Sequence, residues 1–235
     1  MNRIYFVRHG ENYANLTKEF SYKKIDYPLT KKGILQAEQT AEFFARMDID
    51  EIYSSPLLRA RQTAEIIGIR LNLPVVVTEN FREVNVGALE GMPDLMQAWA
   101  INARVSTQWM EGNLEAAFPN GENFLQVRQR MMEGLEQVMA GRTGLNIVIV
   151  CHGGILSATI RDICPGADRA ALKDGRTHNC SITEVLFEEI RASATGKLVS
   201  YASFGHLSGP AADLVSGVLE VDEEPVAGEA APDGD

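Results

Sequence analysis

Two apolar stretches decide the fold: Ile4-Tyr5-Phe6-Val7-Arg8-His9-Gly10 near the N-terminus and Ile147-Val148-Ile149-Val150-Cys151-His152-Gly153-Gly154 in the second half of the chain. Both runs are short and rich in β-branched residues, which is typical of buried parallel strands. Each run ends at a histidine that is followed by glycine. Because ligands in open α/β sheets bind outside the carboxyl ends of the strands, we expect the two histidines to flank one site.

The rest of the chain alternates strand and helix around these two stretches, with no internal repeat. Further strands are expected at residues 51–53, 73–78, 181–188 and 197–203. The last two of these are expected to form an antiparallel pair. Helices are expected at residues 30–47, 55–71 and 155–163. Thr30 is the expected N-cap of the first helix, and Ser55 is the expected N-cap of the second, with Pro56 in its first turn.

A helical segment interrupts this alternation at about residues 92–140, where Pro119-Asn120-Gly121 separates two helical stretches. We interpret this segment as an inserted cap. Residues 79–93 are rich in turn residues and are expected to form a long functional loop. The sequence therefore predicts an α/β fold, with one three-layer α/β/α sandwich domain over residues 1–219 and a mainly parallel central sheet.

The composition is that of a soluble globular protein, with 45% hydrophobic and 23% charged residues. The net charge of −10 argues against nucleic acid as a partner. The N-terminus lacks the features of a signal peptide, and no apolar run is long enough to span a membrane. The three cysteines have no spacing typical of metal or redox pairs, so we expect buried, reduced thiols in a cytoplasmic protein.

The C-terminal segment differs in composition from the rest. Residues 220–235 contain seven acidic residues and no lysine or arginine, together with several Pro, Gly and Ala residues. A segment with so few large apolar side chains cannot offset the entropy lost on ordering. The sequence predicts a disordered acidic tail that is dispensable for activity.

His9 is the expected nucleophile. Arg8 beside it favours an anion as the ligand, and a phosphoryl group in particular. An imidazole that is neutral near pH 7 can attack phosphorus and leave again, which divides phosphoryl transfer into two displacements. The glycine after each histidine allows the backbone to approach an oxyanion closely.

Arg59 and Glu83 are the further candidates. Arg59 lies in the first turns of a helix, where free N–H groups favour anions. Arg61 cannot share its face of the helix, whereas Thr63 can, so we expect Arg59 to point into the site and Arg61 into solvent. Glu83, in the loop of residues 79–93, can protonate an alkoxide leaving group, because adjacent phosphate oxygens favour a neutral carboxyl.

A series of short motifs runs in order from about Arg3 to Leu207. The motifs are Arg8-His9-Gly10-Glu11 with Asn15, Leu29-Thr30-Lys31-Lys32-Gly33 with Gln36-Ala37, Ser54-Ser55-Pro56-Leu57 with Arg59-Ala60 and Gln62-Thr63-Ala64, Glu83 with Gly87 and Glu90-Gly91, Pro119 with Gly121-Glu122, Cys151-His152-Gly153-Gly154, Asn179 with Ser181-Ile182, and His206-Leu207. Together they resemble the histidine phosphatase superfamily, which includes the cofactor-dependent phosphoglycerate mutases. A single Arg-His-Gly is a weak motif, but the ordered set is specific.

The resemblance implies a role for each matching residue. His9 would form a phosphohistidine, and Glu83 would be the proton donor. The phosphoryl oxygens would be bound by Arg8, Arg59, His152, Asn15 and the Gly153 amide. These groups oppose the negative charge of the equatorial oxygens in phosphoryl transfer. The family requires no metal, and no cofactor is expected for this chain. His178 and His206 are expected to have only packing or surface roles.

Two departures from the family pattern favour a phosphatase over a mutase. Mutases of the family have an arginine directly after the acid, where this chain has Val84. They also carry paired arginines in the inserted region, where residues 94–118 contain only Arg104. With fewer cations to retain a phosphorylated intermediate, water should reach the phosphohistidine first. The sequence therefore predicts a phosphomonoester hydrolase, with the mutase as the alternative.

Other classes of protein fit the sequence less well. A thiol phosphatase built on Cys151 would need an arginine six residues later, where the chain has Ser157. A P-loop enzyme would need a glycine-rich run ending in Gly-Lys-Ser/Thr. A non-catalytic phospho-ligand binding module would be expected to lack His9 or Glu83. The expected partner is a small phosphate ester. The sequence does not distinguish among sugar phosphates, phosphoglycerates, phosphoserine and cobalamin-pathway nucleotides as substrates, and it does not distinguish a monomer from a homodimer.

Overall fold

The computed structural model describes residues 1–168, 172, 177–188 and 196–213. In this part of the chain the strands are β1 Asn2–Arg8, β2 Glu51–Ser54, β3 Val75–Val77, β4 Asn146–Cys151, β5 Ile182–Phe187 and β6 Gly196–Ser203. They form one six-stranded sheet in the order β3-β2-β4-β1-β5-β6. The pairs from β3 to β1 are parallel, and β5 and β6 are antiparallel. The predicted mainly parallel sheet with a final antiparallel pair is confirmed.

The helices are α1 Tyr13–Thr17, α2 Lys31–Phe44, α3 Leu58–Leu71, α4 Leu95–Met110, α5 Phe124–Met139 and α6 Gly153–Ile163. Short 3₁₀ turns are η1 Glu79–Phe81, η2 Gly87–Leu89 and η3 Gly209–Ala212. Two elements are shorter than expected: α2 ends at Phe44, and β3 has only three residues. In contrast, α6 is longer than expected, because it begins at Gly153, directly after His152.

The side chains of β1 alternate between the two faces of the sheet. Tyr5 and Val7 point to one face, where they pack with residues of α2 and α3. Ile4 and Phe6 point to the opposite face, where they pack with residues of α5 and α6. This period of two is the expected property of a strand that is buried on both sides. The three-layer α/β/α architecture is confirmed.

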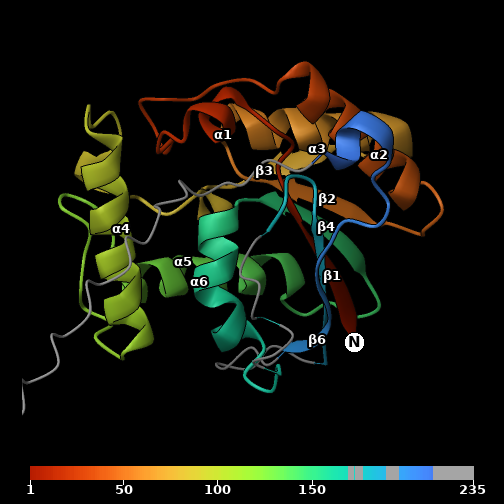
Figure 1. Cartoon of the computed structure of the whole chain (residues 1–235). Coiled ribbons are helices and arrows are strands. Elements are labelled where there is room, and N and C mark those ends of the chain that lie inside the picture. Colours follow the sequence, from red (N-terminus) through yellow and green to blue (C-terminus); the bar gives the residue numbers. More distant parts are fainter. Residues whose placement is uncertain (169–171, 173–176, 189–195, 214–235) are drawn as a thin grey trace, which may run out of the picture.

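The helical segment of residues 92–140 is not a cap over its whole length. In α5 the side chains of Val127, Met131 and Leu135 are fully buried in the core beneath the sheet. Their spacing of four residues places them on one helical face. α5 is therefore part of the outer layer beside α6. Only α4 stands at the end of the molecule, beyond the sheet (Figure 1).

The helix after β2 begins later than the sequence suggested. The prediction that Ser55 is the N-cap is wrong. The N-cap of α3 is Leu57, whose side chain makes no capping hydrogen bond. The carboxylate of Asp26 accepts a hydrogen bond from the Leu58 N–H instead, at 2.9 Å. The cap comes from a distant loop, so local sequence could not indicate it. Ser55 is left free for a contact in the site, described below.

The loop after β1 is fixed against α2 by close backbone contact. Thr30 caps α2 as expected, and its hydroxyl donates to the Glu11 carboxylate at 2.8 Å. Lys32 forms an ion pair with the same carboxylate at 2.7 Å. A Cβ atom at position 33 would lie 2.0 Å from the Glu11 carbonyl oxygen, so only glycine fits there. This contact fixes the chain immediately after His9.

Within the described residues, no helix is long and apolar enough to cross a membrane. The expected disordered tail, residues 220–235, lies outside the described residues, and its dispensability stays a prediction.

Gly33→Ala should destabilise the fold strongly. The added Cβ would overlap a backbone carbonyl that is held in place, so we expect a loss of about 3 kcal/mol or more. For a chain of this size that corresponds to a fall in Tm of about 6–12 °C. The control is Gly166→Ala, where no atom lies within 4 Å of the added Cβ. Equal melting temperatures for the two variants would contradict this account of the loop.

Candidate active site

The register between β1 and β4 brings the two histidines together. Arg8 pairs with Cys151 in the parallel ladder, so His9 and His152 follow side by side at the same edge. The backbone N–H of His9 donates to the Cys151 carbonyl at 3.1 Å. The centroids of the two imidazole rings lie 5.1 Å apart. The structure thus brings His9 and His152 together at the ends of the two strands, where the sequence analysis placed them.

The hydrogen bonds of His9 define its tautomer. Nδ1 lies 2.7 Å from the carbonyl oxygen of Gly10, which can only accept, so Nδ1 carries the proton. Nε2 lies 3.1 Å from Nε of Arg59, which can only donate. Nε2 therefore presents a lone pair toward a cationic side chain. An unprotonated ring nitrogen is the form that an imidazole nucleophile requires.

The surroundings keep His9 neutral. Burial lowers the pKa of His9 well below its ordinary value, and the charges of Arg59 and Arg8 lower it further. The pKa of His152 is also well below its ordinary value, because of burial and then the charge of Arg59. Both rings are therefore uncharged at neutral pH, and the positive charge of the site belongs to the two arginines.

The two arginines are buried beside His9. Arg59 is 3% exposed, and burial lowers its pKa to about 10, although the charge of Glu83 acts in the opposite direction. Its Nη1 and Nη2 donate to the Ser21 hydroxyl and carbonyl at 2.8 and 2.9 Å. Arg8 donates from Nη1 to the carbonyl oxygen of Thr177. Burial of two guanidinium groups at one place is costly unless an anion compensates them.

Two buried nitrogen atoms of the site have no hydrogen-bond partner among the described residues. They are Arg8 Nε and His152 Nδ1. His152 Nε2 lies 2.7 Å from the hydroxyl of Ser55, which also accepts the N–H of Leu57 at 3.3 Å. A Ser55 hydroxyl that donates to Nε2 places the imidazole proton on Nδ1, whereas one that accepts from Nε2 leaves Nδ1 as an acceptor. Arg8 Nε is a hydrogen-bond donor, and in the first tautomer His152 Nδ1 is a donor too.

Glu90 organises the loop that covers Arg59. One oxygen of its carboxylate accepts hydrogen bonds from four consecutive backbone N–H groups, those of residues 22–25, at 2.6–3.0 Å. Burial raises its pKa, but these hydrogen bonds have the greater combined effect, so the pKa of Glu90 is lowered overall. The loop that they hold places Ser21 on the Arg59 guanidinium. Glu90 thus acts on the site through the loop.

The carboxyl group of Glu83 lies at the N-terminus of α6, the helix that begins directly after His152. Its Oε2 accepts the Gly154 N–H at 3.0 Å, and its Oε1 accepts the Ile155 N–H at 2.7 Å and its neighbour Val84 N–H at 2.8 Å. The charge of Glu83 raises the pKa of Arg8, although burial has the larger, opposite effect. These interactions place the carboxyl group among the other candidate residues.

Asn15 and Gly153 also lie at this edge. Asn179 donates from Nδ2 to the His9 carbonyl and to Asn15 Oδ1, both at 3.0 Å, so the Asn15 carbonyl oxygen faces Asn179. A Cβ on Gly153 would lie 3.5 Å from Arg8 Nε, which places the Gly153 backbone beside one of the unpartnered donors. The N–H of Gly153 is at the start of α6, where helical N–H groups lack intrahelical partners.

Other residues considered from the sequence lie outside the site. Arg61 is exposed and lies 3.8 Å from Glu65. His206 contacts Thr40 at 3.0 Å, and burial lowers its pKa to about 4. The ring of His178 packs edge-on against Phe204. Cys151 is fully buried, and burial raises the pKa of its thiol, so it is not available as a nucleophile.

Several residues of the site were not identified from the sequence. Ser55 was assigned to a helix cap, and no role was given to Ser21, Glu90 or Asn179. Ser21 lies in an irregular segment with no periodic pattern, and its contact with Arg59 spans 38 positions of the chain. Such contacts depend on the tertiary fold. Only the order of family motifs pointed to Glu90 and Asn179, and it did not say what they bind.

A metal centre is not formed by the described residues, because no three His, Cys, Asp or Glu side chains there are grouped to hold an ion. Metal-independent activity stays a prediction. The cations at this site are guanidinium groups.

Comparison with known families identifies the arrangement. Residues 4–196 match the family described as the histidine phosphatase superfamily, branch 1. The chain belongs to this superfamily, as the motif order predicted.

Individual relatives carry different names. The chain is 34% identical over 218 residues to the probable phosphoglycerate mutase GpmB of Escherichia fergusonii, which covers 91% of this chain and 98% of that protein. It is 32% identical over 209 residues to the uncharacterized phosphatase PhoE of Bacillus subtilis, covering 89% and 98%. A mutant phosphoserine phosphatase of Entamoeba histolytica, solved with phosphoserine, matches at a TM-score of 0.72 and 26% identity, covering 88% of this chain and 100% of that one. The family is thus certain, whereas the names divide between phosphatase and mutase.

The neutrality of the two rings can be checked by an NMR titration. We expect His9 and His152 to stay unprotonated as the pH falls through 6.5, the ordinary pKa of histidine. The unfolded chain then binds more protons than the native state below this pH, so the free energy of unfolding should decrease on acidification. Imidazole ¹⁵N shifts report protonation, and His9→Gln and His152→Gln spectra assign the rings. A titration midpoint near 6.5 for either ring would contradict the described electrostatics.

Proposed function

We propose that this chain is a phosphomonoester hydrolase that acts on a small phosphorylated metabolite through a phosphohistidine on His9. The observation that carries the proposal is the pair of unpartnered buried nitrogen atoms, Arg8 Nε and His152 Nδ1, beside the lone pair of His9 Nε2. Buried donors without a partner lower stability, and a phosphoryl group would supply acceptor oxygens for both. The site is thus preorganised for a tetrahedral anion.

In the first step, Nε2 of His9 attacks the phosphorus atom. A nitrogen–phosphorus bond forms while the bond from phosphorus to the ester oxygen breaks. Arg59 turns its Nε–H from His9 to a phosphoryl oxygen, and Arg8 and His152 bind the other oxygens. Their positive charge and donors oppose the charge of the equatorial oxygens, which is where most of the catalysis of phosphoryl transfer arises.

Glu83 carries the proton in both steps. Its protonated carboxyl donates to the leaving oxygen, so that an alcohol departs instead of an alkoxide. The carboxylate then accepts a proton from the water molecule that attacks the phosphohistidine. This second displacement breaks the nitrogen–phosphorus bond, releases inorganic phosphate and restores neutral His9. No further reactant is needed for the balance of the two steps.

The substrate class is supported by the solved relatives. The Entamoeba histolytica enzyme holds phosphoserine in one structure and 3-phosphoglyceric acid in another. Both ligands are small phosphate monoesters with alkyl leaving groups. A substrate of this size and charge agrees with a site built around a single phosphoryl group.

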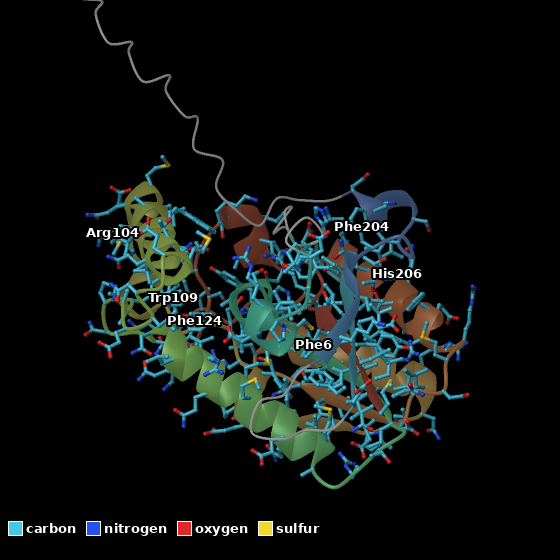
Figure 2. The ribbon with its side chains drawn as sticks, turned by 90° about the horizontal axis from the view of Figure 1, so that it is seen from below. Phe6, Arg104, Trp109, Phe124, Phe204 and His206 are labelled. Atoms are coloured by element: carbon cyan, nitrogen blue, oxygen red, sulfur yellow. The ribbon has the colours of Figure 1, made fainter. Side chains whose placement is uncertain are left out.

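Hydrolysis is favoured over isomerisation by the groups around the proposed acid. Position 84, directly after Glu83, holds an uncharged valine where mutases of the family have an arginine. The Val84 side chain is 6% exposed and packs in the core. Arg104 is exposed on α4, and Figure 2 places it at the outer edge of the molecule. A mutase must keep a bisphosphate bound while it reorients, and each charge-assisted contact contributes about 1.5–3 kcal/mol. The second candidate, a phosphoglycerate mutase, is favoured by the name of the 34% identical relative.

Trapping the intermediate tests the covalent step. Rapid denaturing quench of the enzyme with ³²P-labelled p-nitrophenyl phosphate should yield an acid-labile, base-stable phosphoprotein. His9→Ala should yield none, and it should lose several orders of magnitude in kcat, because the nucleophile is gone. Equal labelling of the two proteins would overturn the role of His9. No turnover by the wild type would favour a non-catalytic binding module.

A second assay separates hydrolase from mutase. The enzyme receives 3-phosphoglycerate with catalytic 2,3-bisphosphoglycerate, and both 2-phosphoglycerate and free phosphate are followed. We expect phosphate release to exceed isomerisation, because position 84 holds valine in place of arginine and Arg104 is exposed on α4. Isomerisation much faster than phosphate release would show a mutase.

A further inference from the structure

The loop that carries Glu83 is fixed by a side chain from the outer helix layer. Residues 82–86, between η1 and η2, form no helix or strand, so the backbone around Glu83 has no regular hydrogen-bonding pattern. The guanidinium of Arg130, in α5, donates to two carbonyl oxygens of this stretch and to one of the preceding η1 turn. The distances are 3.1 Å to Asn80, 2.5 Å to Arg82 and 3.0 Å to Glu83.

Glu122 completes the arrangement. Its two carboxylate oxygens accept hydrogen bonds from Arg130 Nε and Nη2 at 2.7 and 3.0 Å. The same carboxylate accepts the backbone N–H of Asn85 at 2.7 Å. The two side chains are only 17% and 15% exposed, so solvent competes weakly for these contacts. The pair therefore binds the backbone on both sides of Glu83.

The carboxyl group of Glu83 is fixed independently, at the N-terminus of α6. A Cβ on Gly154 would lie 2.6 Å from Glu83 Oε1, so glycine at this position leaves space for the carboxyl group. The orientation of Glu83 thus depends on two supports: α6 holds its carboxylate, and Arg130 with Glu122 holds its backbone. A misplacement of about 1 Å in a catalytic group can lower the rate about 100-fold.

We propose that Arg130 and Glu122 are positioning residues that aim Glu83 at the leaving-group oxygen. The inference rests on the proposed function, in which Glu83 protonates that oxygen. Neither residue makes a hydrogen bond to His9, Arg8, Arg59 or His152 among the described residues. The charge of Arg130 also lowers the pKa of His152. The hydrogen bonds of both residues, however, go to the backbone around Glu83, which is the contact that the proposal uses.

Leaving-group dependence distinguishes this role from a purely structural one. We would measure kcat/KM for a series of substituted phenyl phosphates, from 2,4-dinitrophenyl phosphate to phenyl phosphate. The dinitrophenolate leaves without a proton, whereas phenolate benefits strongly from one. Glu83→Gln should lose about 100-fold or more on phenyl phosphate and much less on 2,4-dinitrophenyl phosphate. Arg130→Gln should reproduce this selectivity, with about 10-fold or more lost on phenyl phosphate and less than about threefold on the dinitrophenyl ester.

Matched variants keep the test independent of folding. Arg130→Lys retains the charge opposite Glu122, but its three donors cannot supply the two hydrogen bonds to Glu122 and the three to carbonyl oxygens that the guanidinium makes. This variant should therefore fold and still show the selective loss. Arg128 lies on the same helix, forms a surface ion pair with Asp162 at 2.8 Å and does not contact the Glu83 loop. Arg128→Gln should therefore leave the leaving-group dependence unchanged.

The outcomes separate this inference from the proposed function. An equal loss on every ester for the Arg130 variants, with selective loss for Glu83→Gln, would overturn the positioning role alone. An equal loss on every ester for Glu83→Gln would overturn the role of Glu83 as the acid, and the positioning role with it. Wild-type behaviour of both Arg130 variants would also refute the positioning role.

Discussion

Parallel pairing of β1 with β4 sets Arg8 opposite Cys151 and thereby sets His9 beside His152. A slip of one residue in this ladder would turn one histidine to the opposite face of the sheet. Several contacts maintain the arrangement after the strands end: the His9 N–H donates to Cys151, and the Glu11 backbone packs against Gly33. The histidine–histidine site is therefore a property of sheet register, and the loops add the charges around it.

The site concentrates positive charge on buried groups that cannot easily lose it. Arg59 and Arg8 are 3% and 9% exposed, and the two neighbouring imidazoles are kept neutral by burial and by the charge of the arginines. The neutral imidazoles leave one lone pair and one N–H donor available, while the guanidinium groups attract an anion. Part of the charge of Arg59 is compensated, because Asp26 lies 3.9 Å from its Nη1 and the charges of Glu83, Asp26 and Glu90 raise its pKa. The arrangement favours binding of a dianion over binding of a neutral molecule.

The sequence predicted those features that depend on local pattern or on strand ends. Alternation along β1 and β4, the Thr30 cap and the meeting of His9 with His152 all follow from short-range rules. Contacts made across the fold could not be predicted. Asp26 caps α3 from a loop, so Ser55 was placed in a cap when it instead contacts His152. The sequence of α5 does not show which surface its apolar face covers, so the helix is not recognisable from the sequence as part of the outer layer. The contacts of Arg130 with the backbone around Glu83 likewise depend on the tertiary fold.

A crystal structure with bound orthovanadate is the most direct test of the central claim, that one phosphoryl group is received between His9, Arg8 and His152. Vanadate adopts the trigonal bipyramidal geometry of phosphoryl transfer. The account predicts a vanadium–nitrogen bond to His9 Nε2, with equatorial oxygens bound by Arg8 Nε, His152 Nδ1 and Arg59. Vanadate bound away from Nε2, or bound there while Arg8 Nε and His152 Nδ1 keep no partner, would contradict it.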